Sequence, residues 1–208
     1  MRLLIDGTEV SWDPSALRTF AEVVEEAGRR AAAGGRVVSR VVVDGREVSA
    51  RLEQEMAARP AGGIGEVHVA TTTPRALLRE ALDGGLDLSA AILRDVQSAA
   101  DSIRSGDLPA AKALYVSGVE SLATFFQLAA AVFNGIQSGA FPLSGGPAGE
   151  GGELPPPPSS TAEILQRLLS VQKAEDWGAM AELLEGEIAP NLREWSSFFS
   201  LLRKTAAE

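Results

Sequence analysis

A segment rich in Gly and Pro, SGGPAGEGGELPPPPSS from Ser144 to Ser160, constrains the fold of this chain more than any other feature. It has almost no apolar side chain to bury, and a segment of this composition behaves as a flexible linker that is stiff only where prolines follow one another. We therefore predict a flexible linker over residues 141–160, with a helical region on each side of it, at 74–140 and 161–208.

The two helical regions resemble each other when the sequence is shifted by 69 residues. Each reads as a helix, a short acidic turn and a second helix, and the shift aligns Asp107 with Asp176. A single helical hairpin cannot bury its apolar face, because helices in proteins depend on packing against a partner. We therefore expect the two hairpins to cover each other, within one chain or between chains. The alignment weakens further on, where Leu122 meets Asn191, so a duplication stays a hypothesis.

The composition excludes several classes of protein. With 208 residues, 45% of them hydrophobic, the chain can form one large domain or two small ones. Its formal net charge of −9 disfavours nucleic acid and anionic lipid as partners, because both are bound through Lys and Arg. The absence of cysteine excludes disulfides and cysteine-ligated metals and fits a reducing compartment. We therefore expect a cytoplasmic protein that does not bind nucleic acid.

Neither an export signal nor a membrane span is predicted. The first ten residues, MRLLIDGTEV, include Asp6 and no apolar run of signal-peptide length. The most apolar stretch, Leu122 to Phe141, contains Gln127 and Asn134 and falls short of the ~20 predominantly apolar residues that a span needs. We interpret it as a buried helix and expect no membrane insertion.

Residues 1–73 show the alternating pattern of a small α+β domain. Leu3 and Ile5 indicate a first strand, Asp6-Gly7 a turn, and a second short strand region closes at Trp12. A helix start is predicted at 13–15, from the sequence Asp-Pro-Ser. The helix itself is indicated by apolar residues at helical spacing, namely Leu17, Phe20, Val23, Val24, Ala27 and Ala31.

The second half of this domain adds three strands and a short helix. The predicted segments are a strand at 36–43, the hairpin turn Asp44-Gly45, a return strand at 46–48, a helix at 49–56 capped by Ser49, a closing loop at 61–63 and a last strand at 66–72. In the last strand Val67 and Val69 share one face, and His68 lies on the other.

In element order and length, this region resembles the ubiquitin-like β-grasp fold. The resemblance rests on MRLLIDGTEV, the Leu17–Ala31 helix, VVVDGREV and EVHVATT, about the first third of the chain. Ubiquitin-like modifiers end in a free diglycine, whereas Thr73-Pro74 here leads into a helix, and Gly84-Gly85 lies inside further sequence. The resemblance implies a fold often used for binding and gives no support for conjugation, since a fold alone does not fix a function.

From Pro74 onward the pattern is helical. A first short helix is predicted to end at Asp83-Gly84-Gly85 and a second at Ser105-Gly106. A third helix carries a seam for helix packing at Tyr115, Val119, Leu122, Phe126, Ala129, Phe133 and Ile136, which Leu114, Phe125, Leu128 and Val132 widen. A face this wide needs several partners, so a bundle is predicted.

After the linker a second hairpin is expected. Asp176 is placed to cap a helix, and Pro190 predicts a break or kink near Ala189, because proline cannot donate a helical hydrogen bond. The fold class is therefore α+β, with a β-grasp-like domain at 1–73 followed by a helical bundle that the flexible linker splits.

No catalytic, cofactor or metal site is predicted. His68 is the one histidine, and neither an orienting partner nor a pocket is evident beside it. The carboxylates follow neither a calcium-loop spacing nor the Glu-x-x-His spacing of di-iron bundles. Gly62-Gly63-Ile64-Gly65 is followed by a strand, whereas a phosphate loop is followed by a helix. We therefore expect a protein that is not an enzyme and needs no cofactor.

Aromatic residues are the strongest indication of a site. They crowd into the end of the chain and into the helix that matches it; the candidate protein-binding residues are Phe125, Phe126, Phe133, Trp177, Trp195, Phe198 and Phe199. Aromatic residues at helical spacing more often form a shared core, which is the favoured interpretation. The alternative is a groove or protein interface, where Trp and Phe are common anchors.

The sequence thus favours a non-enzymatic adaptor or scaffold that binds another protein. In helix pattern the helical half also resembles bacterial secretion and flagellar export chaperones, which are small acidic bundles that hold a partner helix, so a chaperone-like form is included. The alternative is a structural subunit that self-assembles by exchanging the C-terminal hairpin. An enzyme of unknown type is a third hypothesis. A protein partner or self-association is expected, and no small-molecule substrate is evident.

Overall fold

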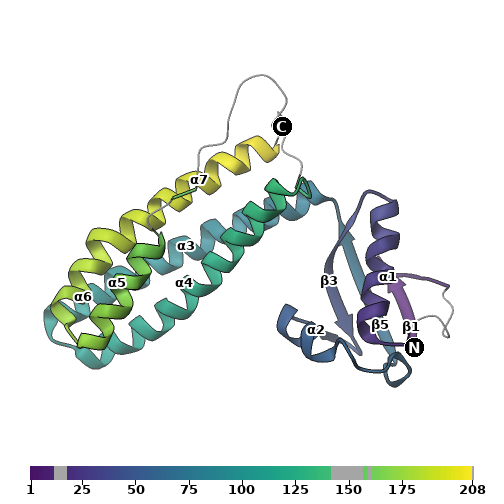
Figure 1. Cartoon of the computed structure of the whole chain (residues 1–208), viewed down its shortest axis with the longest axis horizontal. Coiled ribbons are helices and arrows are strands. Elements are labelled where there is room, and N and C mark those ends of the chain that lie inside the picture. The colour runs from purple at the N-terminus through teal and green to yellow at the C-terminus, as the bar shows by residue number, and fades with distance from the viewer. Residues whose placement is uncertain (12–17, 142–156, 159–160, 208) are drawn as a thin grey trace. The chain divides into compact units, whose positions relative to one another are not determined.

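The computed structural model describes residues 1–11, 18–141, 157–158 and 161–207, and the chain divides into two compact units, Met1–Leu77 and Leu78–Glu208. The first unit contains a mixed five-stranded sheet and the second is helical (Figure 1), so the predicted α+β class is confirmed. Most of the predicted linker, 142–156 and 159–160, lies outside the described residues.

The sheet has the strand order β2-β1-β5-β3-β4, in which β1 and β5 are parallel and the other neighbours antiparallel. The strands are β1 (Arg2–Ile5), β2 (Thr8–Glu9), β3 (Val37–Val43), β4 (Arg46–Glu47) and β5 (Glu66–Thr72). Both hairpins turn at Asp-Gly pairs with positive φ at both residues, 49° and 78° at Asp6-Gly7 and 49° and 79° at Asp44-Gly45. These are the torsions of the type I′ turn that the dipeptides predict.

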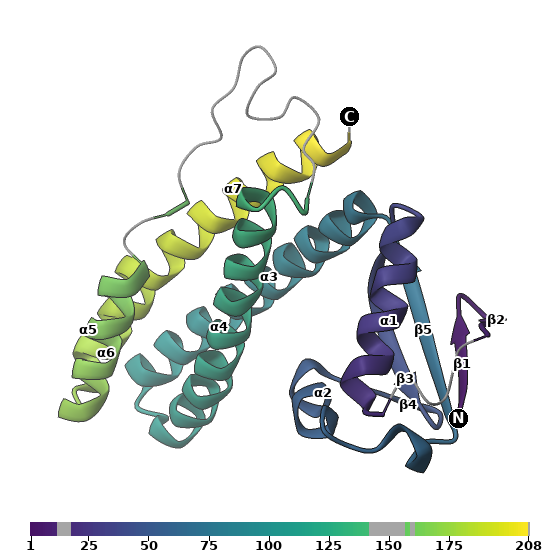
Figure 2. The same cartoon turned by 45° about the vertical axis from the view of Figure 1, so that its right-hand side comes forward.

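One face of the sheet is covered by α1 (Phe20–Ala33), as Figure 2 shows. Thr19 caps this helix and forms a capping box with Glu22, so α1 begins later than predicted; the expected start at 13–15, together with Trp12 and Leu17, lies outside the described residues. The core between helix and sheet consists of Leu3, Phe20, Val23, Ala27, Val41, Val43, Ala61, Ile64, Val67 and Val69.

Two shorter helical pieces connect β4 to β5. Ser49 caps α2 (Ala50–Met56), as predicted, by accepting a hydrogen bond from the Leu52 amide. Ala61–Gly63, expected as a closing loop, forms the 3-10 turn η1, whose Ala61 side chain is buried in the core.

The two Asp-Gly turns hold opposite ends of the central strand β5. Asp44 Oδ1 accepts hydrogen bonds from the amides of Gly65 (3.0 Å) and Glu66 (2.9 Å) at its start. Asp6 accepts from the Thr71 amide (2.8 Å) and hydroxyl (2.6 Å) near its end. The hydrogen bonds from Thr71 hold the pKa of Asp6 below its ordinary value. Each turn therefore closes its own hairpin and also fixes the strand that the hairpin flanks.

The helical unit begins with α3 (Pro74–Ser105), a single helix of 32 residues, so the predicted helix end at Asp83-Gly84-Gly85 is wrong. Gly85 is buried, and a Cβ atom added to it would lie 2.2 Å from Phe199 Cε2. Gly85 is a packing glycine that admits the Phe199 ring against the helix backbone. A packing glycine and a terminating one cannot be distinguished from local sequence.

In α4 (Leu108–Gln137) the predicted seam is displaced. The buried residues are Ala111, Tyr115, Gly118, Leu122, Phe125, Ala129 and Val132. They keep the expected 4-3 spacing, but Gly118, Phe125 and Val132 replace Val119, Phe126 and Phe133. Two apolar repeats run side by side along this helix, and periodicity alone could not decide which of them faces the core.

The second hairpin consists of α5 (Thr161–Ala174), α6 (Trp177–Leu183), the π-helical turn η2 (Leu184–Ile188) and α7 (Ala189–Ala207). Of the break or kink predicted near Ala189, a break does not occur, because helical structure runs without interruption from Trp177 through Ala207. A π turn precedes Pro190 instead, and the Ala189 amide donates to the Leu184 carbonyl. This wider turn accommodates a proline that has no N–H to donate.

The internal resemblance reappears in the turns of the two hairpins. Gly106 (φ 80°) and Glu175 (φ 52°) both adopt the left-handed conformation, and the next residue, Asp107 or Asp176, caps the following helix. The flanking backbone hydrogen bonds also correspond at a shift of 69 residues, for example Asp107 N to Ser102 O and Asp176 N to Val171 O.

Beyond these turns the buried stripes of the two hairpins correspond with one change of register. Ala111 and Tyr115 of α4 match Met180 and Leu184 at a shift of 69 residues. From the last residue of the π turn onward the shift is 70, and the matched pairs are Gly118 with Ile188, Leu122 with Leu192, Phe125 with Trp195, Ala129 with Phe199 and Val132 with Leu202. The π turn thus takes up one additional residue.

Candidate functional site

Five of the seven aromatic residues selected from the sequence gather inside the helical unit. The Phe125 ring of α4 lies 5.5 Å from Phe199 and 6.1 Å from Trp195 of α7, between centroids, and Phe126 and Phe198 each pack against Trp195. Phe125 and Phe199 are fully buried. The cluster joins the two hairpins within one chain, and its burial favours the core role over a surface role.

The other two aromatic candidates lie outside this cluster. Trp177, at the start of α6, meets Tyr115 edge-on with 6.5 Å between ring centroids, and Lys112 Nζ lies 5.3 Å from the Trp177 ring. The Tyr115 hydroxyl donates to Gln172 Oε1 at 2.9 Å, and burial raises the pKa of this tyrosine. Phe133 is half-buried on α4 and takes no part in the buried core cluster.

Polar contacts act both within the second hairpin and between the hairpins. Within it, Trp195 Nε1 donates to Thr161 Oγ1 at 3.0 Å, which ties α7 to the start of α5. The hydroxyls of Ser89 and Ser196 are 2.8 Å apart, between α3 and α7. Arg203 Nε pairs with Asp83 Oδ1 at 2.6 Å, and Arg104 pairs with Glu185. The second hairpin is therefore held by directional contacts as well as by apolar packing.

A second apolar repeat runs along the outer side of α4, and we call it the outer stripe. Its six residues follow the spacing 3-4-3-4-3: Val116, Val119, Ala123, Phe126, Ala130 and Phe133. Val116 and Val119 are 58% and 37% exposed, Ala123 and Ala130 are exposed, and the two phenylalanines are half-buried. The apolar pattern of the sequence does not separate this repeat from the buried one, and the residues selected from it do not include Val116, Ala123 or Ala130.

The neighbouring helix α5 extends this apolar surface. Leu169 is 55% exposed, and Leu165 lines a small hollow together with Phe126. A second hollow is lined by Leu168 and Val119. The α4 side of this surface is nearly free of charge, because residues 121–137 contain no Asp, Glu, Lys or Arg. An exposed surface that is both apolar and uncharged is suited to binding another protein.

In the described part of the chain, α4 is the one helix long and apolar enough to cross a membrane by length and composition. The expectation that this region falls short of a span is corrected on that point. Core helices of soluble proteins meet the same criterion, and the inner side of α4 packs in the core of the helical unit.

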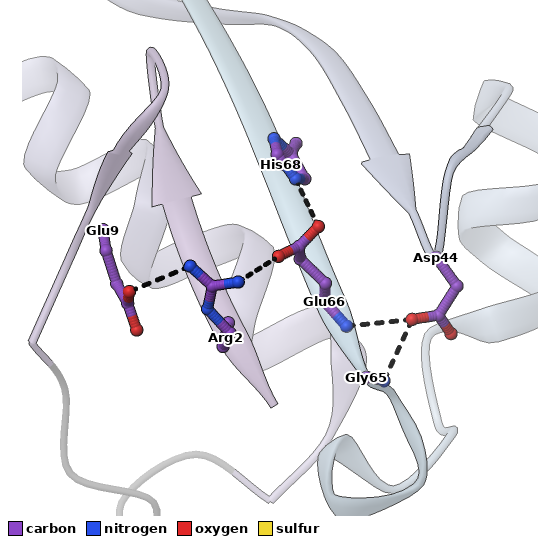
Figure 3. A network of polar contacts seen from close by, with 6 residues as sticks. All are labelled: Arg2, Glu9, Asp44, Gly65, Glu66 and His68. Carbon is purple, nitrogen blue, oxygen red and sulfur yellow. Dashed lines mark hydrogen bonds and ion pairs between the residues drawn. The ribbon is translucent and has the colours of Figure 1, made fainter.

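The sheet unit presents a second candidate surface, on the face that α1 does not cover. Leu4, His68 and Val42 form a row across β1, β5 and β3. Figure 3 shows the polar network beside this row: the Arg2 guanidinium lies 3.1 Å from both Glu9 and Glu66, which raise its pKa. This face is mixed, with half-buried apolar side chains framed by paired charges.

His68 lies on this open face, opposite the buried Val67 and Val69, as the alternation of the strand predicts. The sequence indicates no partner for it, but the structure places Glu66 Oε1 2.6 Å from His68 Nε2. The side chain is 43% exposed, and neither hollow of the helical unit includes it. The pair has the geometry of an oriented base, and a general base also needs a substrate pocket beside it.

Among the residues that the structure describes, no group of three or more His, Cys, Asp or Glu side chains is arranged to hold a metal ion. Comparison of the chain with protein-family models, curated proteins and solved structures finds no match.

Proposed function

We propose that this protein is a non-enzymatic adaptor or scaffold that binds another protein through the outer stripe of α4 and the adjoining leucines of α5. The observation that carries the proposal is the exposure of Val116 and Leu169, 58% and 55%, on a surface whose α4 part has no Asp, Glu, Lys or Arg from residue 121 to residue 137. An apolar stripe of helical spacing is complementary to the apolar face of another helix. Holding such a helix is the chaperone-like form of this function.

The sheet unit supports an adaptor in a second way. Its element order of strand, strand, helix, strand, strand, short helix and strand is the order on which the β-grasp resemblance rests, and we propose that it is a β-grasp-like module. In an adaptor, this module would present its open face to a separate partner.

A capture experiment with matched variants tests the proposal. Val116→Glu combined with Leu169→Glu places two charges on the apolar surface, and Ser117→Glu combined with Ser170→Glu places them at adjacent exposed positions. Proteins retained by the full-length chain are identified, purified and measured for direct binding. We expect the first variant to weaken binding at least tenfold and the second to retain it. Equal binding by both variants would contradict the proposal.

A further inference from the structure

The outer stripe of α4 has a property that points to its partner: it is complementary to itself when reversed. If two α4 helices are placed antiparallel with the centre between Ala123 and Phe126, Ala123 faces Phe126 of the other copy. Val119 then faces Ala130, and Val116 faces Phe133. In two of the three kinds of pair, a small alanine lies opposite a larger side chain. Such alternation lets facing layers interdigitate.

We infer that a second copy of this chain binds the outer stripe, with the two α4 helices packed antiparallel in this register. The inference rests on the proposed function, because it names the partner of the same surface. The 4-3 spacing of the stripe is that of helices that cross at about 20°. The alanines permit a close approach of the two backbones, near the lower end of the 8–10 Å interaxial range.

The charges on α4 select the antiparallel orientation. Lys112 and Glu120 are the only charged residues of the helix. In a parallel pair each would lie beside its own copy, and like charges in contact destabilise a pair. In the antiparallel register Lys112 faces Gln137. The two Glu120 side chains are then separated by nine helical positions, about 13 Å, which exceeds the Debye length of ~8 Å at physiological ionic strength.

The absence of cysteine permits a direct test of register. Val119→Cys and Ala130→Cys are prepared as separate single variants and oxidised alone and as an equimolar mixture. The inferred register brings position 119 opposite position 130, whereas two copies of position 119 are about 16 Å apart along the helix. A disulfide needs Cα atoms within about 7 Å. We therefore expect the mixture to give the mixed disulfide in at least fivefold excess over either homodimer.

Two other results of the cross-linking would overturn the inference. Efficient disulfide formation by Val119→Cys alone would indicate a parallel pair. Equal cross-linking when Ala131→Cys, on a different exposed side of α4, replaces Ala130→Cys would indicate random collision.

Solution mass separates this inference from the proposed function. By sedimentation equilibrium of the full chain we expect a concentration-dependent dimer, which Val119→Glu weakens at least tenfold and Ser117→Glu leaves unchanged. A strict monomer whose capture of a different protein is lost in Val119→Glu overturns the inference and leaves the proposed function standing. A dimer that persists in Val119→Glu overturns it in favour of another interface, such as exchange of the hairpin. If Val119→Glu changes neither self-association nor capture, both proposals fail.

Discussion

The two units of this protein are stabilised in different ways. In the sheet unit the core is built mainly from aliphatic side chains, with Phe20 the one aromatic residue among its described members, and polar contacts hold the ends of β5. In the helical unit large rings from two hairpins fill the centre. The formal charge also differs, since 1–77 contain 10 basic and 11 acidic residues and 78–208 contain 9 and 17. In the sheet unit we therefore expect a substitution to lower stability when it removes a particular hydrogen bond. In the helical unit we expect the loss of stability to grow with the side-chain volume that is removed.

The largest expected effect tests the dependence on volume. Phe199→Ala removes a fully buried ring at the junction of the hairpins and leaves a cavity. We expect it to lower the free energy of unfolding of the helical unit by about 3–5 kcal/mol. Denaturant unfolding of the full chain, followed by hydrogen exchange resolved by peptide, measures each unit separately. Protection of β5 and α1 should be unchanged, and an equal loss in both units would break the comparison.

The next largest effect is expected at two adjacent glycines of α3. Substitution by alanine should lower the free energy of unfolding at one of them and raise it at the other. Gly85→Ala forces a Cβ against the Phe199 ring, and overpacking of this kind costs about 1–3 kcal/mol. Gly84→Ala meets no atom within 4 Å and should raise the free energy of unfolding by up to about 1 kcal/mol, because alanine is the better helix former. Chemical denaturation checks both variants. Stabilisation by Gly85→Ala would show that this glycine has no packing role.

The third effect concerns the stability of the sheet unit and is expected at the turn residue Asp44. Asp44→Ala removes two hydrogen bonds to the start of β5 and leaves alanine at a positive φ of 49°. We expect a loss of about 1–2 kcal/mol, confined to the sheet unit. Asp44→Asn keeps an acceptor oxygen and tolerates the left-handed conformation, so it should lose less. The ranking of the two variants in thermal unfolding is the measurement, and equal losses would contradict the role given to the carboxylate.

The smallest expected effect is a difference in pH dependence. Hydrogen bonds lower the pKa of Asp6 and Glu22 below their ordinary values of 3.8 and 4.5. Groups with a lowered folded pKa contribute stability above the unfolded pKa, and this stability is lost as pH falls through the folded value. Burial raises the pKa of Tyr115 above 10.0, so its effect is a loss of stability as pH rises above about 10.

Peptide-resolved hydrogen exchange across this pH range tests the difference. The sheet unit should lose protection first below about pH 4.5, and the helical unit first above about pH 10. Asp6→Asn should reduce the loss of protection of the sheet unit at acid pH and leave the pH profile of the helical unit unchanged. A common pH profile for both units would remove this part of the comparison.

Features set by local chemistry could be predicted from the sequence. The two Asp-Gly turns, the Ser49 cap and the Asp176 cap depend on a few adjacent residues, and each is found where the sequence places it. Features that depend on the opposing element could not be predicted in the same way. Gly85 continues a helix because Phe199 packs on it, and this partner lies 114 positions away in the chain.

The candidate site likewise contains one feature that the sequence indicated and one that only packing determines. The correspondence of the two hairpins indicated that rings from α4 and α7 would meet, and most of them do. The outer stripe was hidden because its repeat lies one position from the buried one over much of its length, as with Gly118 and Val119 or Phe125 and Phe126. Only the packed structure decides which of two adjacent repeats faces solvent. Exposure, more than residue type, distinguishes a binding surface from a core.

The π turn at Leu184–Ile188 has a consequence for how the internal resemblance of this chain can be recognised. Because one more residue is wound into that turn, the faces of α6 and α7 stay aligned while the numbering slips by one. An ungapped comparison of the chain with itself is therefore one residue out of step beyond the turn, so that Leu122 meets Asn191 in place of Leu192. A single-residue gap restores it. Repeated hairpins in other chains could be overlooked for the same reason, and a π turn marks where the gap belongs.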